Sequence, residues 1–110
     1  MFDMMKMMGK VKEVQEKIKI AQNELGGITA EGESGGGMVK AIANGHKEII
    51  KLEIDSSLYA DEDKDLVNDL IIAAINKAIK EAEEKAKNHI QQATQGLIPN
   101  IPGMDLSGFA

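Results

Sequence analysis

The sequence contains no cysteine, no tryptophan and no arginine, and it has only three aromatic residues among 110. Because cysteine is absent, disulfides, thiolate metal sites and cysteine nucleophiles are excluded. All thirteen basic residues are lysine, so the chain lacks the planar guanidinium group that reads guanine or clamps a phosphate with two hydrogen bonds. We therefore do not expect recognition of a precise base sequence.

Long apolar runs are also missing. No stretch approaches the roughly 20 apolar residues that cross a bilayer, and the first residues do not show the pattern of a signal peptide. We therefore expect a cytoplasmic protein with no membrane contact. A length of 110 residues indicates a single domain. The net charge of −5 disfavours a simple basic nucleic-acid binder, because the overall field repels phosphate.

The first segment, from Phe2 to Leu25, carries apolar residues at alternating intervals of three and four. This spacing is a heptad seam and predicts an amphipathic helix, whose narrow apolar stripe needs a partner. The seam residues are Met4, Met7, Val11, Val14, Ile18, Ala21 and Leu25. Between them lie five lysines and four acidic residues: Lys6, Lys10, Lys12, Lys17 and Lys19 with Asp3, Glu13, Glu16 and Glu24.

From Ile28 the apolar period changes to two, which predicts β-strands over residues 28–33, 38–43 and 48–54. Three glycines separate the first two strands, and Asn44–Gly45 predicts a type I′ hairpin turn between the second and third. In the third strand Ile50, Leu52 and Ile54 are expected on one face. Ile42 and Ile49 fall on the opposite face, which is therefore expected to be partly covered.

A second long helix is predicted from about Asp61 to Ala93, with acidic residues in its first turn. Its first half has a wide apolar surface, whereas its second half has a narrow one and is expected to be an exposed arm. We expect residues 1–95 to form a single domain and residues 96–110 a flexible, Pro/Gly-containing tail. The predicted class is α+β, with the order α-β-β-β-α and a three-stranded antiparallel meander flanked by two long helices.

Several motifs in the sequence superficially resemble catalytic or metal-binding sites. The glycines at 35–37 lead into a strand, whereas a phosphate-binding loop leads into a helix. Ser34 has no plausible triad, and His46 and His89 lack a second ligand at a diagnostic spacing, so both are interpreted as surface histidines. The acidic residues near Asp61 lack the glycine and closing glutamate of a calcium loop. We expect no catalytic residue, no metal, no cofactor and no small-molecule substrate.

The lysines of the first helix allow two interpretations. A helix face of mixed charge is usually only solvated. If two subunits hold helical arms apart, however, these lysines could line a cleft of positive potential together with Lys80, Lys85 and Lys87 of the second helix. Phosphate binding by such lysines would depend on salt and tolerate many base sequences.

The order of segments resembles the YbaB/EbfC family of bacterial nucleoid-associated proteins. The Met- and Lys-rich first helix is followed by four similar segments, and Pro102–Gly103–Met104 is similar to the family's Pro/Gly-rich ending. The four segments are GESGGGMVK (32–40), Asn44–Gly45, IKLEIDSSL (50–58) and DLVNDLIIAAINKA (65–78). The resemblance implies a tweezer-like homodimer that binds double-stranded DNA and has no enzymatic activity. Its expected role is to organise the chromosome or to modulate gene expression.

The resemblance also implies DNA contacts by basic residues on the helical arms. The matching positions are Lys6, Lys10, Lys12, Lys17, Lys19, Lys80, Lys85 and Lys87. The leading hypothesis is therefore a nucleoid-associated protein that binds DNA with low sequence specificity. The alternative is a protein-interaction module that uses the Met-rich heptad helix and the apolar tail.

Overall fold

The computed structural model describes residues 4–95 as two long helices and one sheet. The predicted α+β class, antiparallel meander and pair of long helices are confirmed. In chain order the elements are α1 (Met4–Glu24), η1 (Leu25–Gly27), β1 (Thr29–Ser34), η2 (Gly35–Gly37), β2 (Val39–Asn44), β3 (Ile49–Ile54), η3 (Ser56–Ala60) and α2 (Lys64–Ala93). The predicted tail, residues 96–110, lies outside the described residues.

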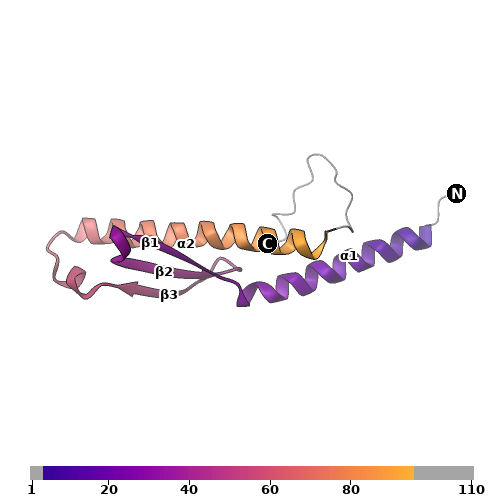
Figure 1. Ribbon diagram of the computed structural model, residues 1–110, viewed down its shortest axis with the longest axis horizontal. Helices are drawn as coiled ribbons and strands as arrows, with labels where there is room; N and C mark the ends of the chain where they lie inside the picture. The colour runs from indigo at the N-terminus through magenta and orange to yellow at the C-terminus, as the bar shows by residue number, and fades with distance from the viewer. Residues whose placement is uncertain (1–3, 96–110) are drawn as a thin grey trace.

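The molecule is elongated, with principal extents of 73 × 25 × 16 Å. α2 lies along one face of the sheet, and α1 projects beyond the sheet along the long axis (Figure 1). Within residues 4–95 no helix combines the length and apolarity needed to cross a bilayer. Most side chains of α1 from Met5 to Ile20 are exposed to solvent.

Small side chains let α2 lie directly on β1. Ala74, Ala78 and Ala82 are fully buried against the sheet. A Cβ atom on Gly32 would lie 2.3 Å from both the Ala74 carbonyl oxygen and the Ala78 nitrogen. Ser34 is buried at the end of β1 and its Oγ donates to the Leu70 carbonyl oxygen. This hydrogen bond therefore links the end of β1 to α2.

The turn between β2 and β3 differs from the predicted type I′ turn. The hairpin is present, but the positive φ falls on Lys47 (65°) and not on Asn44 or Gly45. Asn44 Oδ1 accepts hydrogen bonds from the His46 and Glu48 nitrogens and shapes the connection over residues 45–48. Gly45 is needed for another reason: a Cβ there would lie 2.5 Å from the Leu25 carbonyl oxygen. Its N–H donates to Leu25 O at 2.9 Å and ties the hairpin to the end of α1.

A bulge in β3 corrects the predicted faces of that strand. Ala41 pairs with Leu52 and Ile42 with Lys51, but Ala43 pairs with Ile49, so Ile50 is the extra residue. The bulge moves Ile49 to the helix-facing side, where it packs against the core, and leaves Ile50 exposed. A bulge adds one residue to one strand and so reverses the alternation beyond it.

The second half of α2 is not the exposed arm that its narrow apolar stripe predicted. Ala86 and Ile90 are fully buried, and they form a small core with Ala21 of α1 and Leu25 of η1. The apolar stripe in this half of α2 is narrow because small alanine side chains are enough to fill the space between two closely packed helices. Of the two helices, only α1 extends away from the rest of the described chain (Figure 1).

A candidate nucleic-acid interface

The five lysines of α1 are all exposed on the helix that projects from the body. Among residues 4–95, the side-chain ammonium groups of Lys10, Lys12, Lys17 and Lys19 have no hydrogen bond or ion pair with a protein group. Unpaired ammonium groups can exchange their counterions for phosphates without breaking an internal contact. The structure thus provides four cations that are available to an anionic ligand on one helix.

The α1 lysines form two stripes on either side of the apolar seam. An α-helix has 3.6 residues per turn, so Lys10 and Lys17, seven residues apart, share one face with Lys6. Lys12 and Lys19 share another. The net charge of Met4–Glu24 is +2, from five lysines and three glutamates. A helix inserted beside a duplex therefore presents lysine on more than one side.

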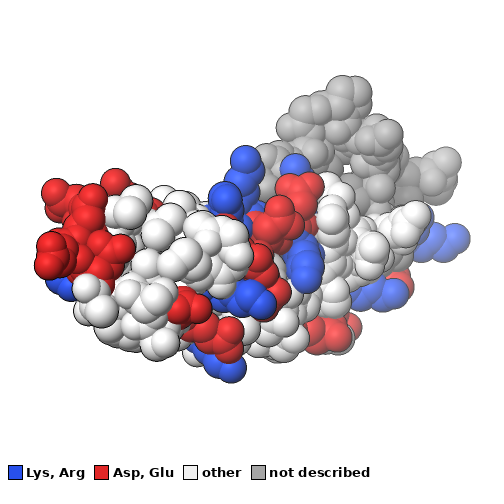
Figure 2. Space-filling view, turned by 60° about the vertical axis from the view of Figure 1, so that its left-hand side comes forward, with Lys and Arg blue, Asp and Glu red and all other residues white. Residues whose placement is uncertain are grey.

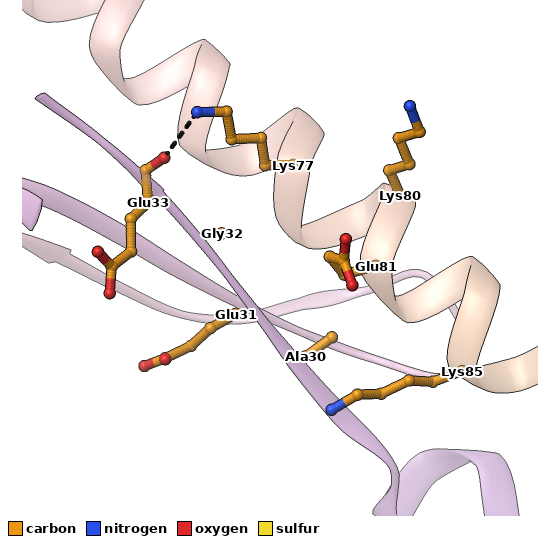
Figure 3. Close-up of a pocket in the computed structure, with 8 residues that line it drawn as sticks. All are labelled: Ala30, Glu31, Gly32, Glu33, Lys77, Lys80, Glu81 and Lys85. Carbon is orange, nitrogen blue, oxygen red and sulfur yellow. Dashed lines mark hydrogen bonds between the residues drawn. The ribbon is translucent and has the colours of Figure 1, made fainter. Parts of the chain in front are cut away.

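The structure does not bring the three α2 lysines together. Lys80 is exposed and points away from β1, whereas Lys85 reaches across to the strand (Figure 3). The Lys85 Nζ donates to the Thr29 carbonyl oxygen at 2.8 Å. Lys87 is half-buried. Lys80 and Lys87 are seven residues apart and share a helix face, but Lys85 lies well away from that face.

A second α2 lysine makes a contact that sequence analysis did not single out. Lys77 Nζ donates to the Glu33 carbonyl oxygen at 3.1 Å. Lys77 and Lys85 line a groove of about 530 Å³ between α2 and β1, together with Lys80 and three glutamates, Glu31, Glu33 and Glu81 (Figure 3). Equal numbers of positive and negative groups give this groove no net charge, so it is a poor site for phosphate. In the sequence, the only sign that Lys77 and Lys85 belong together is their spacing of eight residues along the predicted helix.

The negative charge of the chain is concentrated at the end opposite α1. Residues 55–69 hold six acidic residues and one lysine, a net charge of −5, which equals that of the whole chain. The space-filling view shows a cluster of acidic side chains at one end of the molecule and lysines distributed elsewhere (Figure 2). The remaining residues are neutral overall. The acidic composition therefore does not exclude phosphate binding at α1.

The lysines of the sheet are paired with carboxylates. Lys51 lies 3.0 Å from Glu53 Oε1, and its hydrogen bond and charge lower the pKa of the Glu53 carboxyl. Lys40 lies 3.5 Å from Glu33 Oε1. These pairs leave little positive potential on the sheet, in contrast to the unpaired lysines of α1.

The two histidines have different surroundings. His46 is exposed, as predicted for a surface histidine. His89 is half-buried, and its Nε2 lies 3.6 Å from Glu24 Oε1 where α1 packs against α2, so the prediction of a surface residue is wrong for it. No group of three or more His, Cys, Asp or Glu side chains that could hold a metal ion occurs in the part of the chain that the structure describes.

A model of the YbaB/EbfC DNA-binding family matches residues 1–97. The chain belongs to this family. The YbaB/EbfC match covers both helices, the whole sheet and every lysine discussed above, so the resemblance proposed from the sequence is confirmed. The family is a non-enzymatic DNA-binding family, and this agrees with the absence of a plausible catalytic motif in the sequence.

Curated members of the YbaB/EbfC family are similar over most of their length. The chain is 41% identical over 103 residues to a nucleoid-associated protein of Thermoanaerobacter pseudethanolicus, covering 94% of this chain and 91% of the relative. It is 42% identical over 106 residues to a nucleoid-associated protein of Agrobacterium fabrum, covering 96% and 98%.

A solved structure also shares the fold. An uncharacterized protein of Helicobacter pylori aligns with a TM-score of 0.68 and 30% identity, covering 80% of this chain and 92% of that one. The arrangement of two long helices around a three-stranded sheet is therefore a known fold.

Proposed function

We propose that this chain is a nucleoid-associated protein that binds double-stranded DNA, with low sequence specificity, through the lysines of α1 in a homodimer. The observation that carries the proposal is the set of four exposed, unpaired lysines on the helix that projects from the body. The family's DNA-binding character and the nucleoid-associated relatives support it.

The mechanism is electrostatic. Duplex DNA holds a layer of condensed counterions, and each lysine that neutralises a phosphate releases them, which favours binding by entropy. Contacts to phosphates position a protein on the duplex but carry no base information. Since the chain has no arginine, the side chain that most often reads guanine is missing. Binding through α1 is therefore expected to tolerate many sequences.

An apolar surface between β3 and α2 supports the homodimer. α2 covers β1 and β2 and leaves the helix-facing side of β3 largely open. We call this surface the apolar shelf and define it by Ile49, Leu52 and Ile54 of β3 with Ile71 and Ile75 of α2. Leu52 pairs with the buried Ala41 and so faces the helix side, yet it is 41% exposed. A second copy on this shelf would bury it and hold two α1 helices in a symmetric pair.

The dimer is tested by the mass of the protein in solution. We expect sedimentation equilibrium to give twice the chain mass of 11.9 kDa. Replacing Leu52→Glu buries a charge in the proposed interface and should give a monomer. The matched control, Ile20→Glu, changes an exposed apolar residue of α1 outside the shelf and should remain dimeric. A monomeric wild type, or a dimer unaffected by Leu52→Glu, contradicts this assignment.

DNA binding by α1 is tested with two variants of equal charge. Lys10, Lys12, Lys17 and Lys19 are replaced together by Gln in the first. The second replaces Lys40, Lys47, Lys51 and Lys64 in the same way. Of these, Lys40 and Lys51 lie in the sheet, Lys47 in the turn between β2 and β3, and Lys64 near the acidic end. We expect the first to lose at least about tenfold in affinity for a 30-base-pair duplex and the second to lose much less.

Circular dichroism and sedimentation provide the control for folding and dimer formation in both lysine variants. Equal losses of affinity would show that only net charge matters and would exclude α1 as the binding face. Two duplexes of unrelated sequence should bind each protein with similar affinity. A strong preference for one duplex would contradict the low specificity.

A protein-interaction module is the second candidate, because part of the heptad seam is uncovered. Met7 and Val11 are 49% and 54% exposed, whereas Ile18, further along the seam, is 8% exposed. If this stretch binds another protein, Val11→Glu should abolish that association and leave the affinity for DNA nearly unchanged. An apolar interface is also insensitive to salt, whereas counterion release is not.

A further inference from the structure

The free edge of β1 is covered by side chains of α2. Among residues 4–95, β1 pairs only with β2. In an antiparallel strand every second residue turns its N–H and C=O groups to the same edge. Thr29, Glu31 and Glu33 turn theirs away from β2. Lys85 donates to the first of these carbonyls. Lys77 donates to the third, as the dashed line in Figure 3 shows. Two of the three outward carbonyls are therefore capped by ammonium groups.

The two lysines match the strand in spacing. Eight residues of helix separate Lys77 from Lys85, a rise of about 12 Å. Four residues of strand separate Thr29 from Glu33, a rise of about 13 Å. Glu81 lies midway between the lysines on the same row of α2. Residues four apart on α2, at positions 77, 81 and 85, therefore stay aligned with alternate residues of β1. A lysine side chain at these positions is long enough to reach the β1 backbone.

The opposite edge of the sheet has no such cover. Among the described residues, no side chain donates to a backbone carbonyl of β3, and the ion pair there joins Lys51 and Glu53 through their side chains. A bare strand edge is a template for another strand, and proteins often close it with lysine. The two edges therefore differ in whether a further strand can be added.

We propose that Lys77 and Lys85 close the β1 edge to strand addition by a second copy of this chain. The partner that they exclude is another β1, paired antiparallel about Glu31, because this pairing is self-complementary under a two-fold axis. Copies then associate only on the β3 side of the sheet. The proposal is independent of DNA binding and gives Lys77 and Lys85 a role in limiting assembly.

The test compares two variants that differ only in these lysines. The reference variant carries Glu31→Thr and Glu33→Thr. In a β1–β1 pair about Glu31, these changes remove the repulsion between the two directly opposed Glu31 side chains and between each Glu31 and the diagonal Glu33. The second variant adds Lys77→Ala and Lys85→Ala. Sedimentation velocity over a range of concentrations measures association, and amide hydrogen exchange at residues 29, 31 and 33 reports whether the edge becomes paired.

We expect the lysine-free variant to associate beyond the state of the reference at concentrations at least about tenfold lower. Its three edge amides should exchange more slowly as it assembles. Using Glu31→Pro in place of Glu31→Thr removes the central N–H and should restore the reference behaviour. Identical association of the two variants, or assembly that Glu31→Pro does not reverse, overturns the proposal. If the double lysine change prevents folding, Lys85→Ala alone in the same background gives the comparison.

Discussion

At the scale of single residues, close contact between backbones explains the positions of two glycines. Gly32 lies under α2 and Gly45 lies against Leu25, and neither has a positive φ. In the sequence Gly32 is only a weak position in a strand, and Gly45 is half of a turn signal. Glycine is required at both positions because of contacts with elements that are distant in the sequence. The local sequence pattern therefore could not predict why glycine is needed there.

Replacing Gly32→Ala should strongly destabilise the fold. The added Cβ would lie 2.3 Å from two backbone atoms of α2, so the helix must move away from β1. We expect the free energy of unfolding in urea to fall by about 3 kcal/mol, the upper range for overpacking. Gly27→Ala is the control, since no atom lies within 4 Å of its Cβ position. A loss below about 1 kcal/mol would contradict the close packing.

A second prediction at this scale concerns Asp63, which caps α2. Its Oδ1 accepts a hydrogen bond from the Leu66 nitrogen at 3.0 Å, and the helix begins at Lys64, three residues after the predicted start at Asp61. Asp63→Ala should cost about 1 kcal/mol of stability. The change should leave affinity for DNA within about twofold, because the acidic end is far from α1. A stability equal to that of the wild type would show that the cap does not matter.

At the scale of elements, period and turn chemistry predicted the helices, the strands and their order. The three-four spacing of the α1 seam and the alternation around Ala41 reflect burial on one side of each element. The bulge at Ile50 and the packing of Ala86 against α1 were not predicted. A one-residue insertion leaves no mark in the alternation, and a stripe of alanines does not show which surface covers it.

The exposure of the seam predicts an uneven stability along α1. Ala21 packs with Ala86 and Ile90 of α2, and Ile18 is also buried, whereas the residues from Met5 to Val11 are exposed. Amide hydrogen exchange should be fast from Met5 to Val11 and at least about tenfold slower from Ile18 to Leu25, because local opening follows the loss of buried contacts. Uniform protection along the helix would mean that another segment or another chain covers the whole seam.

At the scale of the whole molecule, the distribution of charge matters more than its sum. The acidic residues gather at 55–69 and the unpaired lysines lie on α1, at the other end of the long axis (Figures 1 and 2). Net charge alone disfavoured a nucleic-acid binder. The separation could not be read from the composition, because it depends on α1 projecting away from the sheet while η3 and the start of α2 lie at the far end.

The dependence of DNA affinity on salt tests the electrostatic mechanism most directly. Fluorescence anisotropy with a 30-base-pair duplex is measured from 50 to 300 mM potassium chloride, for the wild type and for the variant with Lys10, Lys12, Lys17 and Lys19 replaced by Gln. At about −0.9 per neutralised phosphate, four contacts predict a wild-type slope of about −3.5 or steeper for log K against log salt, and a clearly shallower slope for the variant. A wild-type slope near zero, or equal slopes for the two proteins, would contradict phosphate binding by α1.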